Sequence, residues 1–215
     1  MKKTIFIAIA LLVAFAVDST AQSSSSSSSS SRQNKGRAIS SGSNGSSGSL
    51  TNVVGDAVPT GRTFWIQSSN NVGRNKGGYW DVPGRPTSYK DGMNVQSWNI
   101  DNGPDRKYRI ERIPGDRYYR IFVDNSNYYC IDLKGNHSKN GQNIHVWGKN
   151  GSDAQKFYFK RQNNGSYKIF HKSGRLICLS GRSSNNGSNI HLWDNHNGPW
   201  VEWNFIDTNS GRVVR

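Results

Sequence analysis

The stretch Gly-Gln-Asn-Ile-His-Val-Trp at Gly141–Trp147 decides how this chain folds, because two close variants of it occur elsewhere. They read Gly-Met-Asn-Val-Gln-Ser-Trp at Gly92–Trp98 and Gly-Ser-Asn-Ile-His-Leu-Trp at Gly187–Trp193. A self-similar pattern that recurs every ~45 to 50 residues indicates several copies of one structural unit. We therefore interpret the sequence as three repeats, one around each stretch.

Side chains within each stretch should alternate between the two faces of a strand. One face carries apolar or small residues, which are Val95, Ser97, Ile144, Val146, Ile190 and Leu192. The opposite face carries asparagine, then glutamine or histidine, then tryptophan. Amide and imidazole groups beside an indole are typical of a wet surface that hydrogen-bonds and stacks at once.

Each repeat contains four short segments rich in β-branched or aromatic residues and bounded by Gly, Asn, Asp or Pro, which predicts strands and no helix. The segments are Phe64–Gln67, Tyr79–Val82, Val95–Ile100, Lys107–Ile113, Tyr118–Val123, Tyr128–Leu133, Asn143–Trp147, Lys156–Lys160, Tyr167–Phe170, Arg175–Leu179, Asn189–Trp193 and Glu202–Ile206. We expect an all-β fold, a β-trefoil in which six strands form a barrel and three hairpins cap it. Closure of the barrel removes exposed sheet edges.

One aromatic residue follows each tryptophan stretch and stands two positions before a second large apolar residue. These pairs should point inward and form the core, because alternate strand residues share a face. They are Tyr108 with Ile110, Phe157 with Phe159, and Trp203 with Phe205.

The N-terminal part has a different composition. Residues 1–21 resemble a signal peptide, with Lys2 and Lys3 before an apolar run that is short for a membrane span. An uncleaved anchor is the alternative. Residues 22–59 are rich in Ser and Gly and predict a disordered linker. The remaining residues, 60–215, suit one folded domain, and we expect a secreted, extracellular monomer without a stable membrane span.

The formal net charge is +14, and the basic residues are dispersed. Two interpretations stay open: an ordinary solvated surface, or weak affinity for anionic polysaccharides and similar polyanions. Nucleic acid is a poor partner for a secreted protein, and no stacking platform for it is evident.

Two cysteines, Cys130 and Cys178, stand about one repeat apart and would hold equivalent positions in repeats two and three. Positions related by a threefold pseudo-axis lie far apart, which favours two buried thiols. The export context favours oxidation, so a disulfide remains the alternative. Five Asn-x-Ser sequons, at Asn44, Asn136, Asn150, Asn164 and Asn186, are potential glycan acceptors.

No pattern of catalytic or cofactor-binding residues is found. The five histidines lack the spacing of metal ligands, and no Cys-x-x-Cys is present. No nucleophile elbow or phosphate loop occurs. We expect no enzyme activity, no cofactor and no metal.

Repeat two carries a family resemblance, in three motifs: Cys-Ile-Asp-Leu-Lys-Gly at Cys130–Gly135, then Gly141–Trp147, then a degenerate Gln-x-Trp element at Gln155–Phe157. It resembles the ricin B-chain type (R-type) lectin domain, a β-trefoil carbohydrate-binding module. The resemblance extends from Gly61 to about Asp207.

The resemblance implies a sugar pocket in repeat two. There Asp132 would accept hydrogen bonds from sugar hydroxyls, and Trp147 would stack under the pyranose ring. His145 stands where the family often has glutamine, and Gln155 matches the first residue of Gln-x-Trp. Ala154 departs from the pattern, since the family usually has asparagine there.

The other two repeats match less completely. In repeat one Asp81, Gln96 and Trp98 fit, while an Asp-Arg pair at residues 105–106 replaces the family's Asn-Gln. In repeat three we assign Ser180 to the aspartate position and Val201 to the glutamine position. Repeats one and two are therefore the expected sugar sites, and repeat three a structural copy.

The chemistry of these residues suits a sugar independently of the resemblance. A carboxylate accepts two hydroxyls in charge-assisted bonds, and an indole covers the C–H face. Such shallow sites have weak affinities of about 4–6 kcal/mol. We expect a lectin for galactose-type glycans. The alternatives are a structural or adhesive matrix protein that binds polyanions, and an inhibitor or growth-factor-like trefoil.

Overall fold

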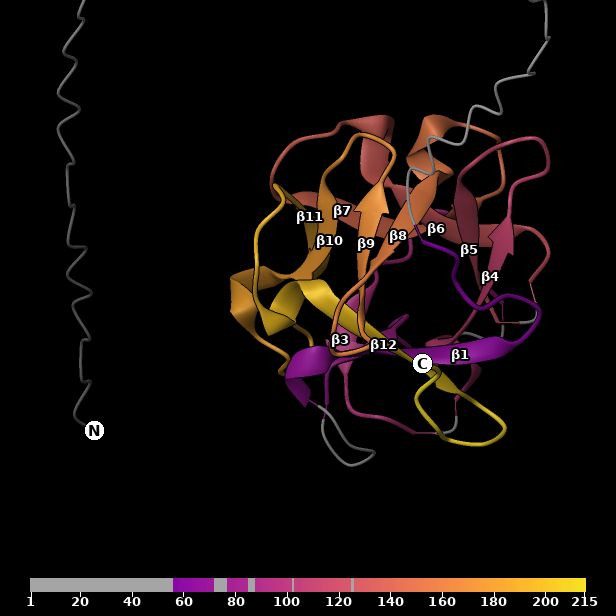
Figure 1. Cartoon of the computed structure of the whole chain (residues 1–215). Helices are drawn as coiled ribbons and strands as arrows, with labels where there is room; N and C mark the ends of the chain where they lie inside the picture. The colour runs from indigo at the N-terminus through magenta and orange to yellow at the C-terminus, as the bar shows by residue number, and fades with distance from the viewer. Residues whose placement is uncertain (1–55, 72–76, 85–87, 102, 125) are drawn as a thin grey trace, which may run out of the picture. The chain divides into compact units, whose positions relative to one another are not determined.

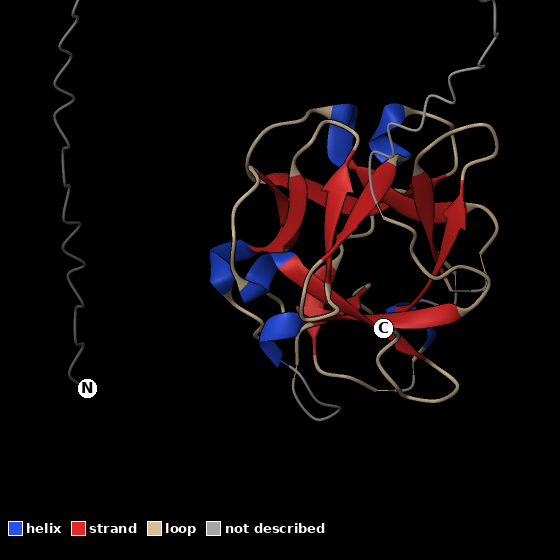
Figure 2. Cartoon of the chain, in the orientation of Figure 1, coloured by secondary structure: helices blue, strands red, loops and turns tan. Residues whose placement is uncertain are grey.

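Twelve strands form one antiparallel sheet system in the computed structural model, which describes residues 56–71, 77–84, 88–101, 103–124 and 126–215. Figure 2 shows strands and loops with only short helical turns. The strands are β1 (Thr63–Ser68), β2 (Tyr79–Asp81), β3 (Gln96–Trp98), β4 (Lys107–Arg112), β5 (Tyr119–Val123), β6 (Tyr129–Leu133), β7 (Gln142–Gly148), β8 (Phe157–Arg161), β9 (Tyr167–His171), β10 (Leu176–Leu179), β11 (Ile190–Trp193) and β12 (Glu202–Asp207). The single-turn 3-10 helices are η1 (Ser69–Asn71), η2 (Pro104–Arg106), η3 (Lys134–Asn136), η4 (Asp153–Gln155), η5 (Ser180–Arg182) and η6 (Pro199–Val201).

Six of the strands close into a barrel. β1 pairs with β4, β4 with β5, β5 with β8, β8 with β9, β9 with β12, and β12 with β1. The first and last strands therefore lie side by side, with Phe64 opposite Asp207 (Figure 1). This ring confirms the predicted β-trefoil, in which no barrel strand keeps a free edge.

Three hairpins complete the fold, one in each repeat of four strands. They are β2–β3 in repeat one (β1–β4), β6–β7 in repeat two (β5–β8) and β10–β11 in repeat three (β9–β12). The second strands of the hairpins meet around the pseudo-threefold axis, through the β7–β11 pairing and isolated bridges from Asn94 to His145 and from Gln96 to Asn189.

The predicted inward pairs all lie in the core. Their six side chains have no solvent exposure: Tyr108, Ile110, Phe157, Phe159, Trp203 and Phe205. Trp80 meets Trp203 edge to face, with ring centroids 5.3 Å apart. The Trp203 Nε1–H donates to the Ile177 carbonyl at 3.0 Å, which satisfies a buried donor. The apolar face predicted for the three stretches is also buried throughout.

The glycine that opens each stretch is required by the packing of the hairpins. All three glycines have positive φ: Gly92 (86°), Gly141 (77°) and Gly187 (83°). Each glycine N–H donates to the carbonyl of the residue before a tryptophan in another repeat. The acceptors are Val146, Leu192 and Ser97, at 2.8, 2.9 and 2.8 Å respectively. Because this conformation places an ordinary side chain under strain, glycine is the favoured residue there.

The asparagine of each stretch takes part in a closed ring of hydrogen bonds around the axis. Asn94 Nδ2 donates to Asn189 Oδ1 at 3.1 Å, and Asn189 Nδ2 donates to Asn143 Oδ1 at 2.8 Å. Asn143 Nδ2 then donates to Asn94 Oδ1 at 2.9 Å, which closes the ring. Each amide gives one hydrogen bond and accepts one, so the glycine and asparagine of the repeat hold the scaffold together.

The predicted signal peptide, the sequon at Asn44 and most of the predicted linker lie outside the described residues. The end of the linker prediction is wrong, because residues 56–59 belong to the folded body. The Asp56 N–H donates to the Phe159 carbonyl at 2.7 Å, and Val58 packs into the core. Within the described part of the chain, no helix is long and apolar enough to span a membrane.

Candidate functional site

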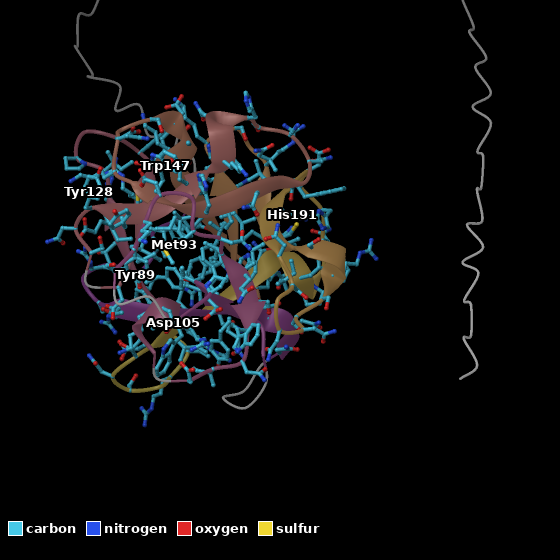
Figure 3. All side chains as sticks on the ribbon, turned by 180° about the vertical axis from the view of Figure 1, so that it is seen from behind. Tyr89, Met93, Asp105, Tyr128, Trp147 and His191 are labelled. Atoms are coloured by element: carbon cyan, nitrogen blue, oxygen red, sulfur yellow. The ribbon has the colours of Figure 1, made fainter. Side chains whose placement is uncertain are left out.

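Each hairpin carries a tryptophan at the mouth of a pocket. Trp98, Trp147 and Trp193 are 37 %, 37 % and 41 % exposed, unlike the fully buried Trp80 and Trp203. Figure 3 shows one labelled residue of each pocket, Asp105, Trp147 and His191, in three separate places on the molecule. The three pockets are therefore independent of one another.

The repeat-two pocket brings together all four residues predicted there. Its cavity of about 300 Å³ is lined by Asp132, His145 and Trp147, with the sequons Asn136 and Asn150 at its rim. The hairpin register sets Asp132 directly opposite His145.

Two donors fix the Asp132 carboxylate. Oδ1 lies 3.0 Å from His145 Nε2, and Oδ2 accepts from Gln155 Nε2 at 3.0 Å. Gln155 is fully buried and is itself held, because its Nε2 also donates to the Gly148 carbonyl at 2.9 Å. A carboxylate has about four lone-pair sites, so Asp132 can still accept ligand hydroxyls.

The His145 ring stacks on Trp147, with centroids 5.2 Å apart and planes inclined by 30°. His145 is only 4 % exposed, so its expected place on a wet surface is wrong and the indole alone faces solvent. The imidazole instead joins the buried acid to the exposed aromatic ring, which sets the relative position of the two groups.

The repeat-one pocket, with a cavity of about 520 Å³, brings together the three residues predicted there. Asp81 lies opposite Gln96 in the hairpin, and its Oδ2 accepts from Gln96 Nε2 at 2.8 Å. Arg106 takes the place that Gln155 has in repeat two, with Nη2 at 3.0 Å from Asp81 Oδ1. The departure from the family pattern thus exchanges a neutral donor for a charged one.

Two buried acids, Asp81 and Asp105, share the Arg106 guanidinium, which also pairs with Asp101. Burial raises the pKa of Asp81 from 3.8 to about 6, and Asp105 adds to the rise. The hydrogen bond from Gln96 and the charge of Arg106 oppose it. Asp81 therefore titrates at mildly acidic pH.

The assignment of Ser180 to the aspartate position is wrong and is corrected by the register, whereas Val201 ends η6 as Gln155 ends η4. Cys178, not Ser180, lies opposite His191 and so holds the position of Asp132. Cys130 lies opposite Trp147, and its equivalent in repeat three is Leu176. The two cysteines are not equivalent. Both are buried and free.

The residues at the positions of Asp132 and Gln155, which we call the floor, are apolar in repeat three. They are Cys178 and Val201, which pack with Phe170 and Leu176 in a buried cluster. Burial raises the pKa of the Cys178 thiol to about 12, so the thiol stays neutral. The cavity above this floor nevertheless measures about 500 Å³.

Several side chains that line the repeat-three pocket were not predicted from the sequence as site residues. Arg182 comes from the hairpin loop, and His196 and Trp200 come from the segment before β12. None of them repeats in the other copies, so the threefold pattern contains no signal for them. Among the described residues, no group of three or more His, Cys, Asp or Glu could hold a metal ion.

Two family models match the chain. One, described as a ricin-type beta-trefoil lectin domain-like family, matches residues 52–147, and the other, the ricin-type beta-trefoil lectin domain, matches residues 117–214. Together they cover residues 52–214, which is all of the described body except Arg215. A search of curated proteins found no match.

Solved structures show the same fold. The chain is similar to ThreeFoil, a designed threefold-symmetric protein (22 % identity, TM-score 0.59, 67 % of this chain and 98 % of that one). It is similar to a ricin B-like lectin of Macrolepiota procera in complex with lactose (17 % identity, TM-score 0.53, 70 % of this chain and 98 % of that one). It is also similar to an exo-β-1,3-galactanase of Clostridium thermocellum (19 % identity, TM-score 0.60), where the match covers 71 % of this chain and only 32 % of the galactanase.

Proposed function

The chain carries a ricin-type β-trefoil lectin domain, and on this basis we propose that it is a secreted, non-catalytic, monomeric lectin for galactose-type glycans. A domain of this type supports carbohydrate binding in general. The proposal adds the sites, which are the pockets of repeats one and two. Macrolepiota procera lectin, of similar fold, binds lactose, a galactoside, and this favours galactose-type ligands.

The proposal rests on one observation: in both repeats a buried carboxylate and a half-exposed indole line the same pocket. The pairs are Asp81 with Trp98 and Asp132 with Trp147. A pyranose offers vicinal hydroxyls to the acid and C–H bonds to the indole at the same time. The pockets are open to solvent, so each site binds weakly, and two sites on one rigid body gain affinity for a multivalent glycan.

A double substitution tests the two sites. Trp98→Ala with Trp147→Ala removes both stacking surfaces, and a titration with galactose, followed by nuclear magnetic resonance, should then show a large loss of affinity. Trp193→Ala is the matched control: it removes a similarly exposed indole and should leave galactose affinity at Trp98 and Trp147 unchanged. Galactose affinity that is undiminished by the double substitution would rule out these two pockets.

The alternative function is adhesion to polyanions through the basic surface, and the net charge of +14 favours it. Ionic strength separates the two functions. Attraction between exposed charges is screened within about 8 Å at physiological salt, so polyanion binding should fall steeply with added salt. Binding of neutral galactose in a pocket should hardly change over the same range, and free galactose should compete.

A further inference from the structure

The repeat-three pocket keeps an aromatic platform although its floor has lost the acid. Trp193 is exposed and stacks on His191, with centroids 5.3 Å apart and planes inclined by 26°. This geometry nearly equals that of His145 and Trp147. The floor residues Cys178 and Val201 offer no strong acceptor for a sugar hydroxyl, so a neutral sugar finds only the stacking half of the site.

A guanidinium stands at the rim of this pocket. The Arg182 Cζ atom lies 4.6 Å from the centre of the Trp200 ring, and both residues line the cavity. Arg182 is exposed and forms no salt bridge with any described residue. Contact with the indole restricts the guanidinium and leaves its donors available to a ligand.

A second cation is buried behind the wall of the pocket. Lys168 is 7 % exposed, and its Nζ donates to the His196 carbonyl at 2.9 Å and to Asn197 Oδ1 at 2.7 Å. The strand residue opposite it, Glu202, accepts hydrogen bonds from Asn164 and Ser166 instead. No salt bridge of Lys168 exists within the described chain. Its charge is screened little by solvent and adds a positive contribution to the potential at the wall.

The other titratable groups that line the pocket do not cancel this charge. Asp194 is its one acidic lining residue, and that carboxylate pairs with Arg175 at 2.9 Å and accepts from Asn140 at 2.7 Å. The His196 ring is held by two neutral partners, since its Nε2 lies 2.8 Å from Trp200 Nε1 and its Nδ1 lies 2.7 Å from the Asp194 carbonyl. Burial lowers the pKa of His191, which disfavours a charge on that ring.

We propose that the repeat-three pocket is a distinct site for a sugar ring that carries an anionic group: a sulfate, a phosphate or a carboxylate. The C–H face of the ring packs on Trp193, and the anionic group binds the Arg182 guanidinium in charge-assisted hydrogen bonds. The site differs in ligand chemistry from the pockets of repeats one and two, so one domain would hold two neutral-sugar sites and one acidic-sugar site.

The test is a titration of the full-length protein, labelled with ¹⁵N, in which the indole N–H signals of Trp193, Trp98 and Trp147 are followed separately. The ligands are galactose, galactose 6-sulfate, galactose 6-phosphate and galacturonic acid, with sodium sulfate as the ion control. At Trp193 at least one acidic sugar should bind about tenfold more tightly than galactose, because a hydrogen bond between charged groups contributes about that much affinity. The three acidic sugars show which anion the site prefers.

Two arginine variants give the matched comparison. Arg182→Gln should weaken binding of the acidic sugar at Trp193 about tenfold, while unchanged Trp98 and Trp147 signals show that the fold is intact. Arg117→Gln removes another exposed arginine that contacts an aromatic ring, Tyr118, and should have no effect. Equal losses in both variants would assign the effect to the general basic surface.

Other outcomes also decide the proposal. It is wrong if every acidic sugar binds at Trp193 no more tightly than galactose, or if sodium sulfate alone competes as well as the sugars do. Failure of galactose to shift the Trp98 and Trp147 signals would instead reject the neutral-sugar sites. The two proposals can therefore fail independently.

Discussion

Repeats two and three have nearly the same hairpin and very different pocket floors. The register, the exposed indole and the stacked histidine are shared, and the two His–Trp pairs differ by only 4° in inclination, from 30° to 26°. The floor changes from Asp132 and Gln155 to Cys178 and Val201. The comparison teaches that this fold does not depend on the polarity of the floor.

The reason lies in where the two sets of residues pack. The glycines and asparagines of the three stretches join the hairpins at the axis, and the large aromatic residues fill the barrel. Cys178 and Val201 belong to a small buried cluster outside that core. A floor is therefore free to be polar, when its groups satisfy one another, or apolar, without disturbing the barrel.

The largest expected effect concerns the acid of repeat two. Asp132→Asn keeps the shape of the floor but loses the charge and one acceptor oxygen. We expect galactose binding at Trp147 to weaken about 100-fold, since a hydrogen bond to a charged group contributes about 1.5–3 kcal/mol. Asp194→Asn, which neutralises an acid of the repeat-three pocket, is the control and should leave that affinity as it was. Equal affinities in both variants would mean that Asp132 does not contact the sugar.

A carboxylate introduced into the floor of repeat three tests the equivalence of the positions. Cys178→Asp should lower the free energy of unfolding by about 2 kcal/mol, because His191 offers one donor but Val201 offers none to the second oxygen. Addition of Val201→Gln should restore about half of the loss. Urea unfolding measures both variants. If the single variant is as stable as the parent, the two floors are not comparable.

Binding in repeat one should depend on pH. Burial favours the protonated form of Asp81, and the ionised form accepts hydroxyls more strongly than the neutral acid does, so binding at Trp98 should strengthen as pH rises through about 6. At pH 5 the affinity should be about tenfold below its plateau, because one pH unit changes the ionised fraction about tenfold. Folding stability should depend on pH in the opposite direction to binding. The stabilisation from protonated Asp81 is largest below pH 3.8 and is lost as pH rises through about 6.

A galactose titration followed at the Trp98 indole from pH 4.5 to 7.5 measures this profile. The variant Asp81→Asn should bind weakly, with no change across that range. A midpoint near pH 4 would contradict the proposed effect of burial.

The smallest effect should be the same in all repeats. Asn143→Ala opens the asparagine ring and should cost about 1 kcal/mol of unfolding free energy. Asn94→Ala and Asn189→Ala should cost the same, because each asparagine donates one hydrogen bond and accepts one in the ring. A second substitution should cost less than the first, because the ring is already open. Urea unfolding that shows widely different costs would mean that the ring is not shared equally.

The sequence predicted most of the fold because its signals are local. All twelve strands lie where the β-branched and aromatic segments place them, to within a few residues at the ends. The buried pairs, such as Phe157 and Phe159, follow from the alternation of side chains along a strand. The linker boundary was placed too late because Val58 packs against residues far away in the chain, and its neighbours in sequence give no sign of that contact.

The candidate sites were predicted where the repeats agree and missed where they differ. Asp132 and Gln155 carry the family motif and come together as expected. Cys178 was misassigned because the spacing between the cysteines is two residues longer than that between Trp147 and Trp193. A shift of two residues leaves a side chain on the same face of a strand, so alternation cannot reveal the error.

The sequence by itself determined the number of repeats, the strands and the face that each side chain occupies, because these depend on periods along the chain. Only the tertiary structure decided which residues share a pocket. Cross-strand hydrogen bonding placed Cys178 opposite His191, and loop packing brought Arg182 onto Trp200. Contacts of this kind join residues through space, and no local pattern in the sequence records them.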